Sequence, residues 1–284
     1  MKSLLIFLTL VTSLVAAPRL VPSDLPLRPT STLELIFDEA MVPQATVGQK
    51  LENNLVTIEP AWEMTLSWRS RNIARLVPKA APEIGGAYQF ILNPGLKNEA
   101  GVEVKLPVFK KLVTEAFTVN RTIRRSSVRT GGMVLIFNDK VSAQAVGPFF
   151  QFISPETKEQ KPQMVAARTR QATWGDITSR YYYSAPWGEQ FAGVKSYRQR
   201  QDPDILSNAI VVEPVSALPI GTGWSLNRLA GVPNLSNTAS INAANAYQIG
   251  NVIPFEIQSV SARTVVDGER EISISFNQSL PVDL

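Results

Sequence analysis

The chain has 284 residues, with 28 Lys and Arg against 24 Asp and Glu, a formal net charge of +4, and neither Cys nor His. The missing Cys excludes a disulfide framework, and the missing His excludes Ser-His and Cys-His catalysis as well as His metal ligands. The mild charge gives no case for nucleic acid as a partner. A hydrophobic content of 44% is ordinary for a folded protein, and 20 Pro argue against a helical one.

The first residues have the pattern of a secretory signal peptide. Lys2 supplies a positive start, 4–15 is a short apolar stretch, and Ala16 and Ala17 are small residues suited to cleavage. The apolar stretch is shorter than the about 20 residues that a membrane-spanning helix needs. We therefore expect a signal peptide over 1–17, no membrane span, and a mature chain exported to the periplasm, the extracellular space or the cell surface.

A Pro-rich lead-in over 18–27 is followed by short strand-like runs with turn signals between them. The predicted strands of this first unit, 28–119, are 33–37, 55–58, 64–68, 73–77, 88–92 and 117–119. Apolar residues alternate most clearly from Met64 to Trp68, so that one side of that strand faces a core. Several short strands in about 90 residues are typical of an immunoglobulin-like β-sandwich.

One phrase occurs three times, as an apolar run that ends in Phe and then Asp or Asn. The three copies are Leu33-Glu34-Leu35-Ile36-Phe37-Asp38, Met133-Val134-Leu135-Ile136-Phe137-Asn138 and Ile272-Ser273-Ile274-Ser275-Phe276-Asn277. Self-similarity in fixed order predicts tandem copies of one structural unit. We expect each Phe to enter a core and the Asp38, Asn138 and Asn277 side chains to shape the turn after the first strand.

A second phrase, Ile84-Gly85-Gly86-Ala87-Tyr88, returns as Ile220-Gly221-Thr222-Gly223-Trp224. It lacks the Lys-Ser/Thr and the helix that a phosphate loop needs, so it predicts a Gly turn before a strand with an inward aromatic residue. Phe37 and Phe137 are 100 positions apart, whereas Gly85 and Gly221 are 136 apart, so the second copy carries 36 additional residues.

These spacings predict the organisation of the remaining chain. The second unit spans 120–256 and carries an insertion at about 154–208, expected in loops or an edge hairpin. The third unit, 257–284, is the start of a truncated sandwich. The fold class is therefore all-β, with tandem immunoglobulin-like (macroglobulin-like) sandwiches, the third one truncated.

The insertion provides the candidate interaction surface, because aromatic residues with Arg are enriched at interface hot spots. The candidate residues are Tyr181, Tyr182, Tyr183, Trp187, Arg198 and Arg200. Two interpretations stay open: the insertion docks a partner such as a neighbouring domain, or it is a long hairpin packed on its own sandwich.

No catalytic, cofactor-binding or metal-binding residue is predicted. The acidic pairs Asp202/Asp204 and Asp38/Glu39 lack the loop spacing of a calcium site. A basic run at the unit junction favours a solvated strand edge or a contact between domains over a nucleic-acid patch. This run comprises Arg121, Arg124, Arg125 and Arg129.

Three stretches together resemble the amino-terminal β-sandwich region of the bacterial alpha-2-macroglobulin family. They are Leu33 to Asp38 with Val47 to Asn53, Trp68 to Asn72 with Pro78 and Gly85 to Tyr88, and Tyr247 to Phe255 leading into Ile272 to Pro281. The resemblance implies a long exported chain of tandem sandwiches that traps proteases. Some members carry a Cys-Glu-Gln thioester, a motif absent from this Cys-free chain.

The first hypothesis is therefore the structural, non-catalytic amino-terminal part of an exported protease inhibitor. Its partners are proteases, bound through the full-length protein, and neighbouring β-sandwich domains of the same chain. The second hypothesis is a cell-surface adhesion or scaffold protein built from tandem bacterial immunoglobulin-like modules, which the first unit also resembles. The third is the β-domain stalk of an exported enzyme.

Overall fold

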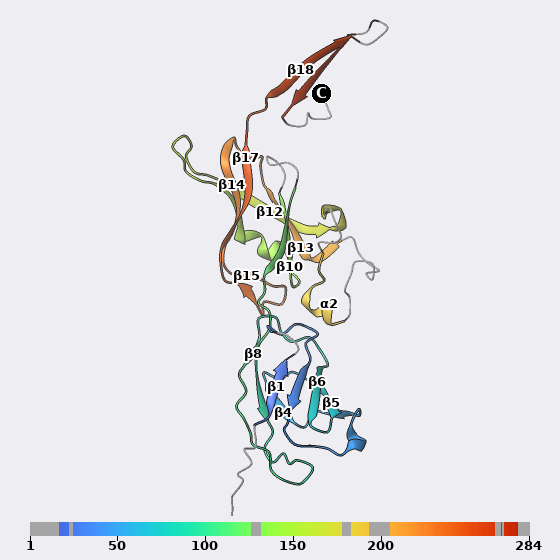
Figure 1. The fold of residues 1–284 in the computed structure, drawn as a ribbon. Coiled ribbons are helices and arrows are strands. Elements are labelled where there is room, and N and C mark those ends of the chain that lie inside the picture. The colour runs from blue at the N-terminus through green and yellow to red at the C-terminus, as the bar shows by residue number, and fades with distance from the viewer. Residues whose placement is uncertain are drawn as a thin grey trace, which may run out of the picture.

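The computed structural model describes residues 17–22, 25–125, 132–177, 183–192, 205–264, 268 and 270–277. The signal peptide predicted over 1–17 lies almost wholly outside these residues. The described chain is built of β-strands in several sheets with short helical turns, which confirms the all-β prediction. In Figure 1 the two larger groups of strands follow one another along the molecule, and the β18 hairpin extends from the end of the second group.

The first unit pairs two antiparallel sheets around one core. Within the described chain, one sheet has the order β1-β2-β6-β5-β3 and the other the order β4-β7-β8. The strands are β1 (Arg19–Pro22), β2 (Leu33–Ile36), β3 (Lys50–Glu52), β4 (Val56–Glu59), β5 (Met64–Ser70), β6 (Ile73–Pro78), β7 (Ala87–Leu92) and β8 (Leu112–Val113). A short 3-10 turn, η1 (Gln44–Thr46), follows β2.

Period-2 alternation places one side of each strand in this core. Leu33 and Leu35 of β2 and Phe90 of β7 are fully buried and belong to the same apolar cluster, which joins the two sheets. The expectation for the first Phe holds, because Phe37 is buried beside Trp68.

The second unit is one antiparallel sheet in the order β17-β14-β11-β12-β13-β10-β9, as far as the structure describes it. Its strands are β9 (Val119–Arg124), β10 (Met133–Phe137), β11 (Phe150–Ser154), β12 (Gln163–Thr173), β13 (Ile205–Pro214), β14 (Gly221–Arg228) and β17 (Asn245–Val252), with a small pair β15 (Val232–Pro233) and β16 (Ser240–Ile241). Its helical turns are α1 (Ala143–Val146), η2 (Gly147–Phe149), η3 (Trp174–Asp176) and α2 (Trp187–Phe191).

The long strand β12 connects the two halves of this sheet. Residues 163–166 pair with β11, and the following residues pair with β13 as far as Thr173. The sheet folds back until its outer strands approach, where the Arg124 guanidinium donates to the Ile249 carbonyl at 2.9 Å. The insertion was expected in loops or an edge hairpin, but β12 lies within it and is a central strand. The predicted strand at 117–119 is also shifted, because β9 begins at Val119.

Strand β10 is buried on both faces. Met133, Leu135 and Phe137 belong to the larger core between the folded halves of the sheet. Val134 and Ile136 belong to a second core on the opposite face, which the residues after β12 cover. This double burial explains why β10 is a continuous apolar run without alternating polar residues.

The third group of strands is the hairpin β18 (Ile257–Thr264) and β19 (Arg270–Phe276). Its residues are exposed along almost their whole length. Two paired strands alone do not form a core. They lie where the sequence predicts the start of a third unit, which stays a prediction. No helix among the described residues is long and apolar enough to cross a membrane.

Candidate functional site: the junction between the first two units

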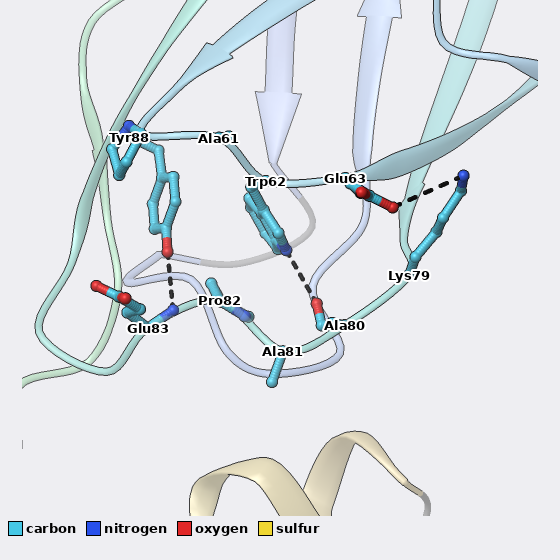
Figure 2. Close-up of a pocket in the computed structure, with 10 residues that line it drawn as sticks. Ala61, Trp62, Glu63, Lys79, Ala80, Ala81, Pro82, Glu83 and Tyr88 are labelled. Carbon is cyan, nitrogen blue, oxygen red and sulfur yellow. Dashed lines mark hydrogen bonds and ion pairs between the residues drawn. The ribbon is translucent and has the colours of Figure 1, made fainter. Parts of the chain in front are cut away.

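The loop 79–86 between β6 and β7 forms the end of the first unit that faces the second. Two aromatic residues fix this loop from inside. The Trp62 indole donates to the Ala80 carbonyl at 2.9 Å, and the Tyr88 hydroxyl accepts from the Glu83 amide at 2.8 Å (Figure 2). Burial raises the pKa of Tyr88 above its ordinary value.

The same residues border a surface hollow of about 390 Å³. Lys79 reaches toward Glu63 on its rim at 4.0 Å, as Figure 2 shows. The rings of Trp62 and Tyr88 contact each other with centroids 5.0 Å apart, and both side chains are buried. The hollow therefore has charged residues at its rim and no exposed aromatic face that a ligand could stack on. We interpret Trp62 and Tyr88 as residues that hold the loop in place rather than as a ligand site.

The outer side of the loop packs against the second unit. The Trp187 indole nitrogen of α2 donates to the Pro82 carbonyl at 2.6 Å, and Trp187 is buried. Ile84 from the same loop is buried among the core residues of the second unit. Gly85 has a φ of +71°, as the predicted Gly turn requires, and a Cβ at Gly85 would lie 3.7 Å from that of Ala239.

Helix α2 is held in place by the strands of the second unit. The Asn208 side-chain amide on β13 donates to the Phe137 carbonyl at 2.7 Å and to the Ser184 carbonyl at 3.0 Å, just before α2. Lys140 forms an ion pair with Glu189 of α2, with 3.6 Å between the charged atoms. These contacts orient the indole of Trp187 toward the first unit.

The linker between the units is fixed by the repeated Phe-Asn phrase. The Asn138 side chain donates to the Ala116 carbonyl and accepts from the Thr118 amide, both at 2.9 Å. Phe117, between these two residues, stacks on Phe137 with centroids 5.6 Å apart and planes 17° apart. Asn138 therefore binds the backbone on either side of Phe117, whose ring packs in the core of the second unit.

The same linker clamp recurs at the start of the third unit. The Asn277 side chain donates to the Pro254 carbonyl at 2.7 Å and accepts from the Glu256 amide at 3.0 Å. Phe255 stacks on Phe276 with centroids 5.0 Å apart and planes 18° apart. The repeated Asn residues thus bind the preceding linker, a role beyond the turn that the sequence predicts for them.

The predicted interaction surface is divided between two places. Tyr183 packs edge-on against Trp174, with centroids 4.8 Å apart, over the outer core of the second unit. Trp187 lies in the junction and contacts the first unit. The other predicted surface residues, Tyr181, Tyr182, Arg198 and Arg200, lie outside the described residues. Of the two described residues, Trp187 therefore contacts the neighbouring unit and Tyr183 packs on its own unit.

A charged network lies on the sheet beside Tyr183. Asp176 accepts two bonds from Arg170, at 2.6 and 2.8 Å, and two more from the amide and hydroxyl of Thr173. The hydrogen bond from Arg170 is the main reason why the pKa of Asp176 lies well below its usual range. Arg125 lies 3.4 Å from Asp176 and 3.0 Å from Glu213.

This network accounts for part of the basic run. Arg125 donates a hydrogen bond to Glu213 of the same unit, and Arg124 donates one to the Ile249 carbonyl. Arg124 is the last residue of β9 and Arg125 follows it, and β9 is an outer strand of the sheet. These two residues therefore lie at a strand edge, which is one of the two positions predicted for the basic run. Arg129 lies outside the described residues.

In the described ranges, no group of three or more Asp or Glu is arranged to hold a metal ion. Of the predicted acidic pairs, Glu39 accepts a hydrogen bond from the Asn98 side chain, and Asp202/Asp204 lie outside the described residues. The junction itself contains carbonyls, aromatic rings and apolar side chains. Its chemistry is that of a packed contact between domains.

The partners of Trp187 and the linker residues of the junction are not predicted from the sequence. Pro82 and Ile84 carry no signal that identifies them as a docking surface. The linker Phe has such a signal, because Phe117 precedes Phe137 by 20 positions and Phe255 precedes Phe276 by 21. A Phe at matched distance therefore precedes the second and third copies of the phrase, whereas the first copy has Ala at these positions.

Comparison with protein-family models, with curated proteins and with solved structures gives no match to this chain.

Proposed function

We propose that these units are the structural, non-catalytic amino-terminal domains of an exported alpha-2-macroglobulin-like protease inhibitor. In this role they frame a protease trap and position the parts that contact the protease. The observation that supports the proposal is the junction between the units. Trp187 and Ile84 each contact the other unit there, and the linker residue Phe117 is buried in the core of the second unit. A trap needs its domains in fixed relative positions, and buried contacts of this kind restrict interdomain motion.

The test is steric exclusion by the full-length protein. Proteases of several classes are incubated with it, and cleavage of a large protein substrate is compared with cleavage of a short peptide. A trap lowers cleavage of the large substrate while the peptide is still cleaved, because an enclosed protease stays active toward molecules that reach it. Undiminished cleavage of the large substrate rejects the inhibitor function.

The alternative is a cell-surface adhesion or scaffold protein of tandem bacterial immunoglobulin-like modules. Tyr88 favours it, because its hydroxyl bonds to the backbone at Glu83, five residues upstream, near the start of β7. A Tyr bonded in this way at a strand start is a feature of immunoglobulin-like sandwiches. Binding of the full-length protein to cells or to matrix components, without any effect on proteases, supports this alternative over the inhibitor.

Both functions are non-catalytic for the 284-residue chain. Purified chain is expected to give no turnover with peptide, ester or glycoside substrates above a buffer blank. Measurable turnover that follows the protein through purification contradicts both proposals and favours an enzyme.

A further inference from the structure

The two junctions are built from the same parts, so corresponding residues can be compared. Ile84 corresponds to Ile220 in the repeated Gly phrase. The aromatic residue of each phrase fixes the loop five positions earlier, since Tyr88 accepts from the Glu83 amide and the Trp224 indole donates to the Pro219 carbonyl at 3.1 Å. The linker clamp is repeated as well, as described above.

Corresponding residues differ in one respect, which is their burial. At the first junction Ile84 is 4% exposed and Phe117 is 3% exposed, because the second unit covers them. At the second junction Ile220 is 57% exposed and Phe255 is 49% exposed. The loops and linkers of the two junctions are formed alike, but within the described part of the chain only Ile84 and Phe117 of the first junction are covered by a following unit.

The β18–β19 hairpin extends this uncovered apolar surface. Ile272 and Ile274 correspond to Met133 and Leu135, which are core residues of the second unit, yet they are 67% and 48% exposed. They share a face with Val260, which pairs with Ile274. The residues between them are Ser, so the hairpin has one apolar and one polar face.

Beneath the linker the second unit is hollowed. A depression of about 490 Å³ is bordered by the β11–β12 turn, by the Ile220 phrase and by the linker through Pro254. The side chain of Gln160 bridges part of it by accepting from the Thr222 amide at 2.8 Å. The second unit therefore ends in a depression whose lining combines polar side chains from the β11–β12 turn with the apolar residues Ile220, Val252 and Pro254.

We propose that Ile220, Phe255 and the Ile272/Ile274 face of the hairpin form one docking surface for the rest of a third β-sandwich. The occupant belongs to the same polypeptide, because the Asn277 clamp places β18–β19 as the Asn138 clamp places β9–β10, whose covering strands come from the same chain. It packs on Ile220 and Phe255 as the second unit packs on Ile84 and Phe117. This inference rests on the proposed function, in which the units are consecutive domains of a longer chain.

The test uses introduced cysteines, each of which is the only thiol in the 284-residue chain, and labelling is read by mass spectrometry on the peptide that carries the introduced residue. Ile220→Cys and Ile274→Cys are made in the 284-residue chain and in the complete natural polypeptide, and their labelling rates with a maleimide are compared. We expect rapid labelling in the 284-residue chain and labelling slower by about tenfold or more in the complete polypeptide, because a covered thiol reacts only after local opening.

Ser273→Cys, on the polar face of β19, is the matched control and is expected to label faster than Ile274→Cys in the complete polypeptide. Equal rates for Ile220→Cys in both proteins overturn the proposal. Slow labelling of the 284-residue chain that depends on its concentration also overturns it, because the occupant is then a second copy. Protection of Ile220→Cys without inhibition of any protease rejects the inhibitor function and retains the docking surface.

Discussion

Trp187 donates its indole hydrogen to the Pro82 carbonyl at 2.6 Å, and this bond joins residues that are 105 positions apart in the chain. The donor belongs to the insertion of the second unit and the acceptor to a loop of the first. The insertion at about 154–208 therefore contributes one side of an interdomain contact.

The first prediction concerns this bond. Trp187→Phe keeps most of the apolar contact but leaves the Pro82 carbonyl without its donor, and we expect a loss of about 1–2 kcal/mol in the free energy of unfolding. Trp187→Ala also opens a cavity and costs about 3–5 kcal/mol. Urea unfolding followed by far-ultraviolet circular dichroism measures both. Gly188→Ala on the same helix is the control, because a Cβ there meets nothing within 4 Å, and it stays within about 0.5 kcal/mol. An unchanged midpoint for Trp187→Phe contradicts the role of the bond.

The second prediction concerns the linker clamp. Asn138→Ala removes the two bonds to the Ala116 carbonyl and the Thr118 amide in a buried site, so we expect a loss of about 1–3 kcal/mol. Asn277→Ala affects only the exposed hairpin, so global stability stays within about 0.5 kcal/mol. Hydrogen exchange of the Glu256 amide should nevertheless accelerate in Asn277→Ala. An equal loss of unfolding free energy in Asn138→Ala and Asn277→Ala contradicts the prediction.

The third prediction is a pH dependence from Asp176. Its pKa in the folded protein is lower than in the unfolded chain, where an Asp has a pKa of about 3.9. The carboxylate therefore stabilises the fold above about pH 4, and this stabilisation is lost as the pH falls through the unfolded and then the folded pKa. Asp176→Asn should be less stable than the parent at pH 7, with a smaller difference at pH 2. Urea midpoints at the two pH values measure this, and a constant difference is the contrary result.

The fourth prediction concerns two glycines. A Cβ at Gly132, just before β10, would overlap the backbone carbonyl of Val212 on β13, and we expect Gly132→Ala to cost several kcal/mol because neither strand can move away. A Cβ at Gly188 in α2 meets nothing within 4 Å. Gly188→Ala is therefore expected to be neutral or to stabilise by about 0.5 kcal/mol. Thermal unfolding compares the two, and a mild Gly132→Ala contradicts the close approach.

Local patterns predict β2, β4, β5, β6 and β7 of the first unit, but they miss the short strands β3 and β8 and also β1, which lies in the predicted lead-in and pairs with β2. The alternation of Met64 to Trp68 and the Gly turn before Tyr88 depend on neighbouring residues only, and the structure has a strand and a turn in these places. Strand β12 could not be predicted in the same way. Its outer residues are polar, including Arg168 and Arg170, and its central position depends on pairing with β11 and β13.

The candidate site was predictable in part. An aromatic insertion indicates a contact, and Trp187 makes one. Its acceptor is the backbone carbonyl of Pro82, and a backbone atom leaves no trace in residue type. The burial of Ile84 likewise depends on a neighbouring unit rather than on the residues beside it. Contacts between units are set by geometry over long separations, which composition and periodicity do not record.

The shared strand β12 has a mechanical consequence. Because its first residues pair with β11 and its later ones with β13, one uninterrupted backbone belongs to both halves of the second unit. Pulling the halves apart would require tearing hydrogen bonds along β12 rather than sliding two independent sheets over one another. Under tension the second unit is therefore expected to yield in a single step, with both of its cores lost together.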